Sequence, residues 1–545
     1  MGRAAPRRVV QGVAGAAALI AALTVLSRLA GFGRTLVFTN AVGADSTGDT
    51  YTAANNVPNI VFEVVAGGAL ASLVVPMLAG SIAAGNREHV RGTASALLGW
   101  ALLVLTPLAV LVALFAEPIA RLLLGSGSDD AKVALAARFL LVFAPQVVLY
   151  GIGIVFTGVL QAHRRFAGPA LAPLMSSVVV AGAYLLFAGI GGSRDLRDLS
   201  TPAELVLGVG TTLGVVALSL SLLLPVRRLR LGLRPSLRFP VGVAPRVRRL
   251  ALAGILTLAG QQLVAAVAIR LANDGAPDGT QVAYAAGLTV FLVPWAALAV
   301  PLATSAYPGL AERADAGDEE GFGRSLAPVV VLVVVAAAVA AAVLVAIAGP
   351  MARVFLASQS GATVATLRDT IVAFGPGLVG YGLVAVLTRA LYARGLWRAP
   401  TVCVVGGWLL AVVADVVLSA VLPAHDRATA LGAGHSIGVT VAGLSLLAVV
   451  ARAAGPAALS GVLRVGVPAL AGALLGGAAG LLLARVLGAD PVPSGGVLAA
   501  VGTGVTVAAV VALVAAAVIM GTARAPLTAV LRGLRAAGRQ EVHGG

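Results

Sequence analysis

The chain has few charged or aromatic residues for its length. Of its 545 residues, 11% are Asp, Glu, Lys or Arg and 5% are Phe, Trp or Tyr, whereas 59% are hydrophobic and the mean hydropathy is +0.99. An ordinary soluble domain needs about a quarter charged residues, so this composition excludes a water-soluble globular protein. Apolar runs of about 20 residues recur along the chain, and each can cross about 30 Å of hydrocarbon as a helix. The sequence therefore predicts an all-α polytopic membrane protein.

Cysteine is almost absent as well. Cys403 is the only one, which excludes an internal disulfide and a zinc cluster, and its apolar surroundings indicate a small core residue. Neither a P-loop nor an H-E-x-x-H motif occurs, and Gly151-Ile152-Gly153 lies inside an apolar run without the strand–turn–helix context of a nucleotide site. We therefore expect no enzyme, cofactor or metal. Transport would draw on an ion gradient, the membrane potential, substrate flux or a partner protein.

The formal net charge of +16 does not indicate a nucleic-acid-binding protein. The arginines are scattered over short loops with almost no aromatic residues between them, which is typical of cytoplasmic loops under the positive-inside rule. The basic loop "VRRLRLGLRPSLRFPVGVAPRVRR" and both termini fall on one predicted side, and loops such as "NDGAPDGT" fall on the other. Both termini are therefore predicted to be cytoplasmic, which requires an even number of spans. The basic and then apolar N-terminus is interpreted as an uncleaved first span.

Hydropathy divides the chain into an even number of candidate spans. The fourteen expected spans are 12–41, 55–83, 92–115, 132–161, 167–190, 203–224, 249–273, 281–307, 326–349, 364–393, 399–422, 428–452, 463–485 and 494–520.

An internal repeat relates the two halves of the chain. Tyr51 matches Tyr284, Pro76 matches Pro308, and "LQAHRRFAGP" aligns with "LYARGLWRAP", all at nearly the same offset along the chain. Because three separate landmarks share one offset, we predict two parallel six-helix lobes and two further helices. Duplicated lobes with a site between them are a common transporter plan, in which rocking of the lobes gives alternating access.

The repeat also predicts the domain boundaries. They are 1–224 for the first lobe, 225–248 for an Arg-rich cytoplasmic linker, 249–452 for the second lobe, 453–520 for the last two spans and 521–545 for a basic cytoplasmic tail. Two interpretations of the tail stay open: a short amphipathic helix on anionic lipid, or a disordered segment.

Two arginines stand inside the first span. Arg28 and Arg34 lie in "LSRLAGFGRTLVFTNAVG", where a charged side chain costs about 2.5–3.5 kcal/mol on insertion scales. Six positions correspond to about 240° around a helix, so we expect a bend at Gly31 and Gly33 to turn both inward. Snorkelling toward headgroups is the alternative, but a shared polar cavity is favoured. Paired guanidinium groups suit a phosphate or pyrophosphate.

The second span contains a proline among polar residues, "NNVPNIVFEVV". Pro58 interrupts the helical hydrogen-bond ladder, and the side chains of Asn55, Asn56 and Asn59 can satisfy or exploit the freed groups. We count Asn55 and Asn59 as candidate substrate-binding residues.

Two acidic residues accompany these asparagines. Glu63 follows Asn59 by about one turn, and because an isolated carboxylate in apolar surroundings is neutral or paired, we expect it to pair with Arg28 or Arg34. Asp49 lies at the predicted outer end of the hairpin, where an acid is ordinarily a solvated loop residue or a helix cap.

Three further polar residues are predicted to lie in the membrane. Arg270, near the end of its span, either snorkels outward or supplies a cation from the second lobe. Asp415 is mid-span, which makes it a candidate proton or ion site or equally a hydrogen-bonded structural acid. His435 is expected to be structural.

The N-terminal part of the chain resembles a known family. The stretch "SRLAGFGRTLVFTNAVGADSTGDTYTAANNVPNIVFEVVAGGALASLVVPMLAG" is similar to the start of the MurJ (MviN) lipid II flippases of the MOP exporter superfamily, which share an S-R-x-x-G-F-x-R signature, an acid near Asp49 and an L-P-N motif, here Val57-Pro58-Asn59. Fourteen helices, two lobes plus a final pair, are also that family's plan.

The resemblance implies translocation of an undecaprenyl-pyrophosphate-linked peptidoglycan precursor to the outer leaflet of a bacterial cell membrane. It implies that Arg28 and Arg34 line a central cationic cavity, that Asp49 is functionally important, and that the last two spans form a groove for the lipid tail. It also implies wall-synthesis or division proteins as partners.

The chain departs from the family at several positions. Well-studied members carry basic residues just after the P-N motif, where this chain has Ile60, Val61, Phe62 and Glu63. Their next glutamate corresponds to Gly67, and their Asp-Arg pair in the eighth helix corresponds to Ala286-Gly287. The cavity is therefore expected to be less cationic, with Arg270 as a candidate for compensation.

The departures keep other functions open. The chain could export another polyprenyl-linked glycan, act as a cation-coupled multidrug exporter that depends on Asp415 or Glu63, or serve as a scaffold in wall assembly.

Overall fold

In the computed structural model, residues 23, 25–64, 74–125, 127–240, 243–489 and 495–543 are described, and every regular element among them is a helix. The chain divides into two compact units, Met1–Asp274 and Gly275–Gly545. The fold is therefore all-helical, as predicted.

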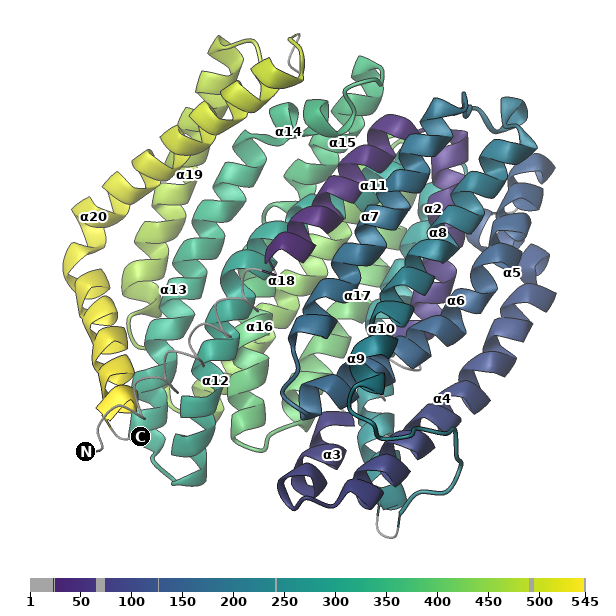
Figure 1. Cartoon of the computed structure of the whole chain (residues 1–545). Helices are drawn as coiled ribbons and strands as arrows, with labels where there is room; N and C mark the ends of the chain where they lie inside the picture. Colours follow the sequence, from purple (N-terminus) through teal and green to yellow (C-terminus); the bar gives the residue numbers. More distant parts are fainter. Residues whose placement is uncertain are drawn as a thin grey trace, which may run out of the picture. The chain divides into compact units, whose positions relative to one another are not determined.

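The first unit consists of long and short helices and one longer non-helical segment, residues 228–240 (Figure 1). They are the first helix, 25–41, followed by α2 (Ser46–Phe62), α3 (Val74–Ala83), α4 (Arg87–Leu114), α5 (Ala116–Leu124), α6 (Asp130–Ala162), α7 (Ala167–Gly189), α8 (Thr201–Ser221), α9 (Leu223–Arg227) and α10 (Val243–Asn273), with a 3₁₀ turn at Leu196–Asp198.

The second unit has the same kind of elements. They are α11 (Thr280–Pro294), a π-turn (Trp295–Ala299), α12 (Val300–Asp315), α13 (Glu319–Ala346), α14 (Ala348–Phe355), α15 (Gly361–Phe374), α16 (Gly377–Ala393), α17 (Arg398–Val421), α18 (Arg427–Ala453), α19 (Val462–Val486) and α20 (Val497–His543), with 3₁₀ turns at Ala424–Asp426 and Pro456–Leu459.

Ten helices within the described residues are long and apolar enough to cross a membrane, or eleven if one bent pair is a single span. Each of the eleven coincides with one of the fourteen predicted spans. The other three predicted spans are 12–41, 55–83 and 249–273. The first two extend into positions outside the described residues, and α10 covers the third, so the count of fourteen stays a prediction.

The element boundaries repeat between the two units. Helix α4 begins at Arg87 and α13 begins at Glu319, and the same separation relates the first residues of the short helices α5 and α14. The C-terminal ends of α6 and α16, Ala162 and Ala393, are separated by nearly the same interval. The offset read from the sequence is therefore also the offset between equivalent helices.

One turn shows the repeat in backbone detail. Arg164 ends α6 with a φ of 57°, and Gly395 ends α16 with a φ of 71°. The amide of Arg165 donates to Leu160 O, and the amide of Leu396 donates to Leu391 O, both at 2.8–2.9 Å. This left-handed helix end suits glycine, and the first unit carries arginine there.

The predicted span 364–393 is not one straight helix. Helices α15 and α16 meet at Gly375-Pro376 with a bend of 46°. Hydropathy could not predict the bend, because Gly375 and Pro376 are apolar enough to continue the run while proline interrupts the hydrogen-bond ladder.

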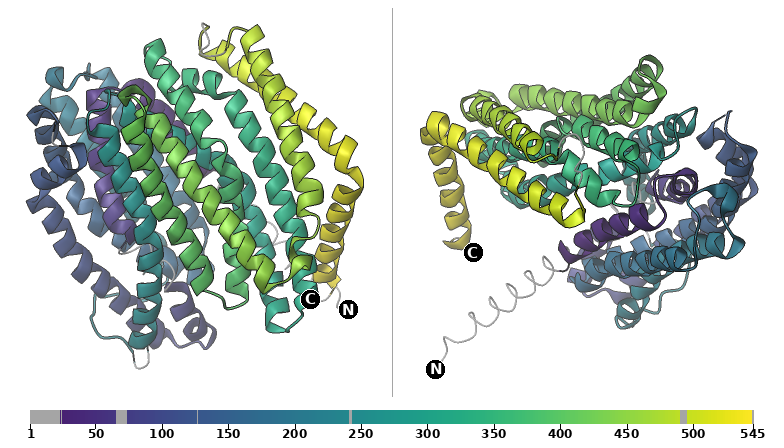
Figure 2. Two further views of the ribbon diagram at one scale, coloured as in Figure 1. Left: turned by 180° about the vertical axis from the view of Figure 1, so that it is seen from behind. Right: turned by 90° about the horizontal axis from the view of Figure 1, so that it is seen from above.

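Helices α19 and α20 run side by side in Figure 1 and in the left view of Figure 2, and both contact α13. Glycines spaced four apart on α19 allow the close approach: a Cβ on Gly476 would lie 2.6 Å from Val511 O, and one on Gly472 would lie 2.9 Å from Ala515 O. This is the small-xxx-small packing of membrane helices. Helix α20 is interrupted at Ala523 (φ −130°, ψ 19°), and the basic tail continues from there as a helix to His543.

By packing, α10 belongs with the first unit, although the repeat assigns its sequence to the second half. It contacts α5 and α2.

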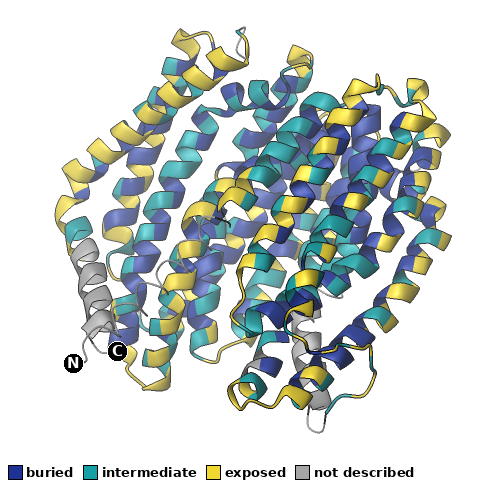
Figure 3. Ribbon diagram, in the orientation of Figure 1, coloured by how far each residue is buried: buried dark blue, intermediate teal, exposed yellow. Residues whose placement is uncertain are grey.

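Buried and exposed residues alternate around single helices such as α4 (Figure 3), and the exposed face of α4 carries large apolar side chains such as Leu103 and Leu114. That pattern suits a lipid-facing surface.

Candidate substrate-binding site

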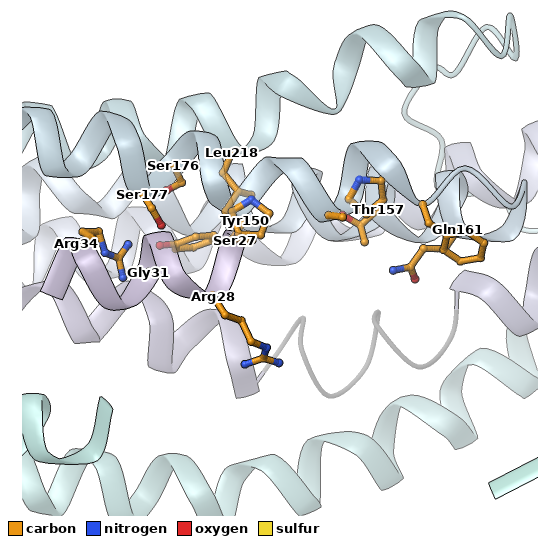
Figure 4. Close-up of a pocket in the computed structure, with 14 residues that line it drawn as sticks. Ser27, Arg28, Gly31, Arg34, Tyr150, Thr157, Gln161, Ser176, Ser177 and Leu218 are labelled. Atoms are coloured by element: carbon orange, nitrogen blue, oxygen red, sulfur yellow. The ribbon is translucent and has the colours of Figure 1, made fainter. Parts of the chain in front are cut away.

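A cavity of about 580 Å³ opens within the first unit, between the helix 25–41 and helices α6, α7 and α8 (Figure 4). Its walls combine two arginines with hydroxyl and amide groups on an apolar frame. The lining residues are Ser27, Arg28, Gly31, Arg34, Tyr150, Thr157, Gln161, Phe166, Pro169, Ala170, Pro173, Ser176, Ser177 and Leu218.

Both predicted arginines line this cavity, and the expected bend at the glycines stays a prediction. The helix runs unbroken from residue 25 to residue 41. At about 100° per residue, Arg28 and Arg34 lie about 60° to either side of Gly31, so a stripe centred on Gly31 includes both. Figure 4 shows Arg34 turned toward Tyr150 and Ser177, whereas Arg28 extends away from them.

No acid neutralises these arginines within the described part of the chain. Neither Arg28 nor Arg34 forms a hydrogen bond or ion pair with a described residue, and Arg28 is exposed while Arg34 is half-buried. The described lining contains no carboxylate. The cavity therefore presents two permanent positive charges with the hydroxyls of Ser27, Ser176 and Ser177 as additional donors.

A buried aromatic cluster lies behind the cavity. Tyr51 Oη is 2.8 Å from Tyr184 Oη and 2.6 Å from Thr211 Oγ1, and the ring of Tyr51 packs edge-on against Phe143. Satisfied buried hydroxyls of this kind make a wall rigid.

The candidates on α2 do not line this cavity. Asn59 donates to Asn55 O at 3.0 Å and Asn56 donates to Thr52 O at 2.8 Å, so these amides are used within their own helix. Asp49 is buried in the first turn of α2, where the positive end of the helix dipole favours an acid. It is not a solvated loop residue.

The predicted pairing of Glu63 is wrong. Glu63 is half-buried at the C-terminal end of α2 and forms no ion pair with Arg28, Arg34 or any other described residue. Spacing along one helix could not show this, because the partner had to come from another helix whose rotation the sequence does not give.

Arg270 lies elsewhere in the first unit. It forms an ion pair with Asp274, 2.6 Å away, at the end of α10. Gly125, with a φ of 104°, lies directly beneath this pair, since a Cβ there would clash with Asp274 and Arg270. Arg270 therefore does not line the described cavity.

In the second unit, Asp415 on α17 and His435 on α18 are buried, and none of their side-chain polar atoms has a hydrogen-bond partner among the described residues. The carboxylate of Asp415 packs against Gly434. His435 lies among the rings of Phe291, Phe374, Tyr381 and Trp408, at centroid distances of 5.3–6.3 Å.

A G-x-S-x-G sequence does occur, at residues 434–438, but it is not a hydrolase elbow. It lies within the helix α18, and Ser436 Oγ donates to Ala373 O and Phe374 O. A hydroxyl already bonded to two carbonyls within a helix is not an exposed nucleophile.

Sequence reasoning missed the part of the wall that α6 and α7 supply. Tyr150, Thr157 and Gln161 come from α6, and Ser176 and Ser177 come from α7. One signal was available: Gln161 and the Ser-Ser pair are polar residues within apolar runs. Nothing in the sequence indicated that they share a cavity with the first span.

Comparison with known proteins identifies the family. The profile of the lipid II flippase MurJ matches residues 38–489, which is more than half of the chain. The chain belongs to the MurJ lipid II flippase family. Arg28 and Arg34 precede the matched residues. The protein is accordingly a multi-pass membrane protein of a transporter family, not an enzyme.

Similar proteins agree with this membership. The lipid II flippase MurJ of Burkholderia cenocepacia is 24% identical over 405 residues, covering 71% of this chain and 74% of that protein. A probable lipid II flippase MurJ of Rhizobium tropici is 26% identical over 388 residues, covering 69% and 70%.

Solved structures show the same fold. A lipid II flippase MurJ in an inward closed conformation covers 91% of this chain and 98% of its own, with a TM-score of 0.70 at 18% identity. An inward-facing multidrug resistance MATE transporter of the MOP superfamily covers 82% and 99%, with a TM-score of 0.66 at 13% identity. The MurJ and MATE folds are thus shared by this chain.

Two of the positions expected to depart from the family pattern, Phe62 and Gly287, make apolar contacts here. Phe62 packs on Tyr150, with ring centroids 5.0 Å apart. Gly287 is buried, and a Cβ there would lie 2.8 Å from Thr370 Cγ2, so a side chain at this position would require Thr370 to shift. Gly67 lies outside the described residues.

Proposed function

We propose that this protein moves lipid II, the undecaprenyl-pyrophosphate-linked peptidoglycan precursor, from the inner to the outer leaflet of a bacterial cell membrane. Family membership supports the cargo class. The observation that carries the proposal is the cavity lined by Arg28 and Arg34, in which neither cation is paired with a described residue and the described lining holds no carboxylate.

The pyrophosphate is the part of the cargo that this cavity suits. Each guanidinium offers a planar fork of donors that stays charged at any physiological pH. Arg34 binds one phosphoryl group beside Tyr150 and Ser177, and the exposed Arg28 binds cargo as it enters. Hydrogen bonds to charged groups contribute about 1.5–3 kcal/mol each, enough to bind the headgroup without trapping it.

The transport cycle that we propose is alternating access of the two lobes, with both termini in the cytoplasm. In this cycle, lobes 1–224 and 249–452 alternate between inward-facing and outward-facing states, while spans 13 and 14 hold the lipid tail. The repeated helix boundaries support two equivalent lobes, and wall-synthesis or division proteins are the proposed partners.

For the energy source, we propose an ion gradient or the membrane potential acting through Asp415. A buried carboxylate whose two oxygens have no hydrogen-bond partner among the described residues is costly unless it is protonated or binds a cation. Its protonation or occupancy would differ between the two states of the second lobe. Asp415→Asn is expected to slow transport while leaving cargo binding intact.

The first experiment is complementation of a bacterium depleted of its own lipid II flippase, with lipid II exposed on the outer leaflet as the readout. The native chain should restore exposure, and Arg34→Ala should lower it roughly 10- to 100-fold, the loss of one charged hydrogen-bonding group. The control is Arg121→Ala, which removes an exposed arginine paired with Glu117 and Asp130 outside the cavity. Full activity of Arg28→Ala and Arg34→Ala in inserted protein would overturn the cationic-cavity mechanism.

A second candidate function is export of another polyprenyl-linked glycan, or cation-coupled export as in MATE proteins. The apolar contacts of Phe62 and Gly287 favour it, because the resemblance to the family leads one to expect charged side chains at these two positions. A native chain that inserts but restores no lipid II exposure would support the second candidate. Dye efflux that depends on Asp415 and not on Arg34 would then select the cation-coupled exporter. A scaffold in wall assembly would instead tolerate the loss of Arg28.

A further inference from the structure

Part of the Arg-rich linker packs against helix α4 of the first unit. Residues 228–240, here called the strap, follow α9 and run along α4 (Figure 1). The amide of Ser236 donates to Ser95 O at 3.1 Å, and the amide of Arg234 donates to Ser95 Oγ at 3.2 Å. The strap backbone is therefore fixed to the helix.

The contact with α4 is close enough to need a glycine. A Cβ on Gly99 would overlap the backbone of Ser236. At the start of the strap, Arg87 Nη2 donates to the carbonyl oxygens of Leu229 and Arg230 at 3.2 and 3.4 Å. Two parts of the strap are thus tied to the same helix.

The strap alternates between apolar and basic residues. Leu231 is buried in the core of the first unit, and Leu229, Leu233 and Phe239 pack against that core. The intervening arginines are all exposed: Arg228, Arg230, Arg234 and Arg238. Although the backbone turns at 228–230 and has positive φ at Arg230 and Gly232, the leucines and Phe239 pack on the core and the arginines stay exposed, so the strap has a packed apolar side and an exposed basic side.

These exposed arginines have no acidic partner. None of the four forms an ion pair with a described residue, and the strap itself contains no acid. Arg91 is exposed on the adjacent first turns of α4, and so is one acid, Glu88. The surface therefore carries a fixed excess of positive charge.

An exposed tryptophan places this surface at the edge of the membrane. Trp100 lies near the start of the long apolar run of α4, and its Nε1 donates to Leu237 O of the strap at 3.0 Å. Both Trp100 and Leu237 are exposed. Tryptophan is enriched where hydrocarbon meets headgroups, which puts the arginines at headgroup level.

We infer that the strap is a binding surface for anionic phospholipid headgroups, with Trp100 and Leu237 inserted at the acyl boundary and the four arginines on the phosphates above it. Charge complementarity selects this occupant, because an array of unpaired guanidinium groups beside an apolar anchor fits a phosphate-bearing bilayer surface. The inference does not depend on the transported cargo.

The test measures which lipid lies next to Trp100 in the full-length protein. The protein is reconstituted in nanodiscs that contain acyl-brominated phosphatidylglycerol or acyl-brominated phosphatidylcholine, whose bromines quench tryptophan. The contribution of Trp100 is the difference between the native protein and Trp100→Phe. We expect the association of phosphatidylglycerol to exceed that of phosphatidylcholine by at least about fivefold, the effect of one arginine near an anionic surface, and to fall with added salt.

Two charge-matched variants separate the strap from overall charge. The strap variant changes Arg228, Arg230, Arg234 and Arg238 to Gln. The control variant changes Arg324, Arg452, Arg464 and Arg524, all exposed in the second unit, to Gln. The strap variant should lose the preference and the control variant should keep it, at unchanged melting temperature.

Two outcomes would overturn the inference. One is equal quenching by the two lipids in the native protein, a measurement that requires no variant to fold. The other is a preference that survives in the strap variant, which would assign the arginines to a soluble acidic partner and the preference to another surface.

Discussion

Ser436 Oγ lies 2.7 Å from the carbonyl oxygen of Ala373 and 3.1 Å from that of Phe374. These two carbonyls end α15, just before the Gly375-Pro376 bend, where the helix ends and its last carbonyls lack helical partners. A hydroxyl from α18 therefore holds the broken end of a neighbouring helix.

Ser436→Ala is expected to destabilise the bend. Removal of the hydroxyl leaves the two carbonyls without this donor, at a cost of about 0.5–2 kcal/mol in a membrane protein. Thermal unfolding in detergent measures this loss of stability, with Ser460→Ala, at an exposed turn position of the same unit, as control. Equal melting temperatures for Ser436→Ala and native protein would show that the contact does not stabilise the bend.

Filling the cavity at Gly31 should block transport without unfolding the protein. A Cβ on Gly31 or on Gly33 meets no atom within 4 Å, but only Gly31 lines the cavity. We expect Gly31→Phe to abolish lipid II exposure in the depleted strain, while Gly33→Phe retains it. Similar activity of the two variants would count against the cavity as the cargo path.

A larger side chain at position 476 should weaken the packing of α19 against α20. A side chain there would push against Val511 O, and overpacking of a close contact costs about 1–3 kcal/mol. Gly476→Leu is expected to lower the melting temperature, and Gly502→Leu, at an open position on α20, should not. If the tail of the cargo lies along these helices, Gly476→Leu will also reduce transport.

The N-terminal end of α6 should respond to acid. The amide of Ala131 and then the guanidinium of Arg197 stabilise the ionised form of Asp129 and lower the pKa of this carboxyl. Because the folded-state pKa is lowered, the stabilisation is present above the ordinary pKa of about 4 and is lost as the pH falls through the lower folded value. Asp129→Asn should therefore unfold earlier than native protein at pH 7, and the gap should close below about pH 4. A gap that persists in acid would exclude the carboxylate as its cause.

Several features could be predicted from local sequence. Hydropathy of about 20 consecutive residues is enough to identify a span, because each helix in lipid satisfies its own backbone groups. The repeat is visible as a constant offset between landmarks such as Tyr51 and Tyr284, and the same kind of offset relates the boundaries of α4 and α13. Arg28 and Arg34 are identifiable because charge within an apolar run is costly and calls for a partner or cargo.

Contacts between helices could not be read in the same way. Pairing Glu63 with an arginine required the rotation of two helices about their axes, and packing did not bring them together. The hydroxyls of Ser176 and Ser177 reach the arginine cavity only because α7 packs beside the helix 25–41.

Ser436 finds the carbonyls of Ala373 and Phe374 from a helix distant in the chain. The length of an apolar run and the position of a charged residue within it are local properties, so both can be predicted from the sequence. Which polar groups come to share a cavity is settled only by the folded molecule, because it depends on side-chain packing between helices that are far apart in the chain.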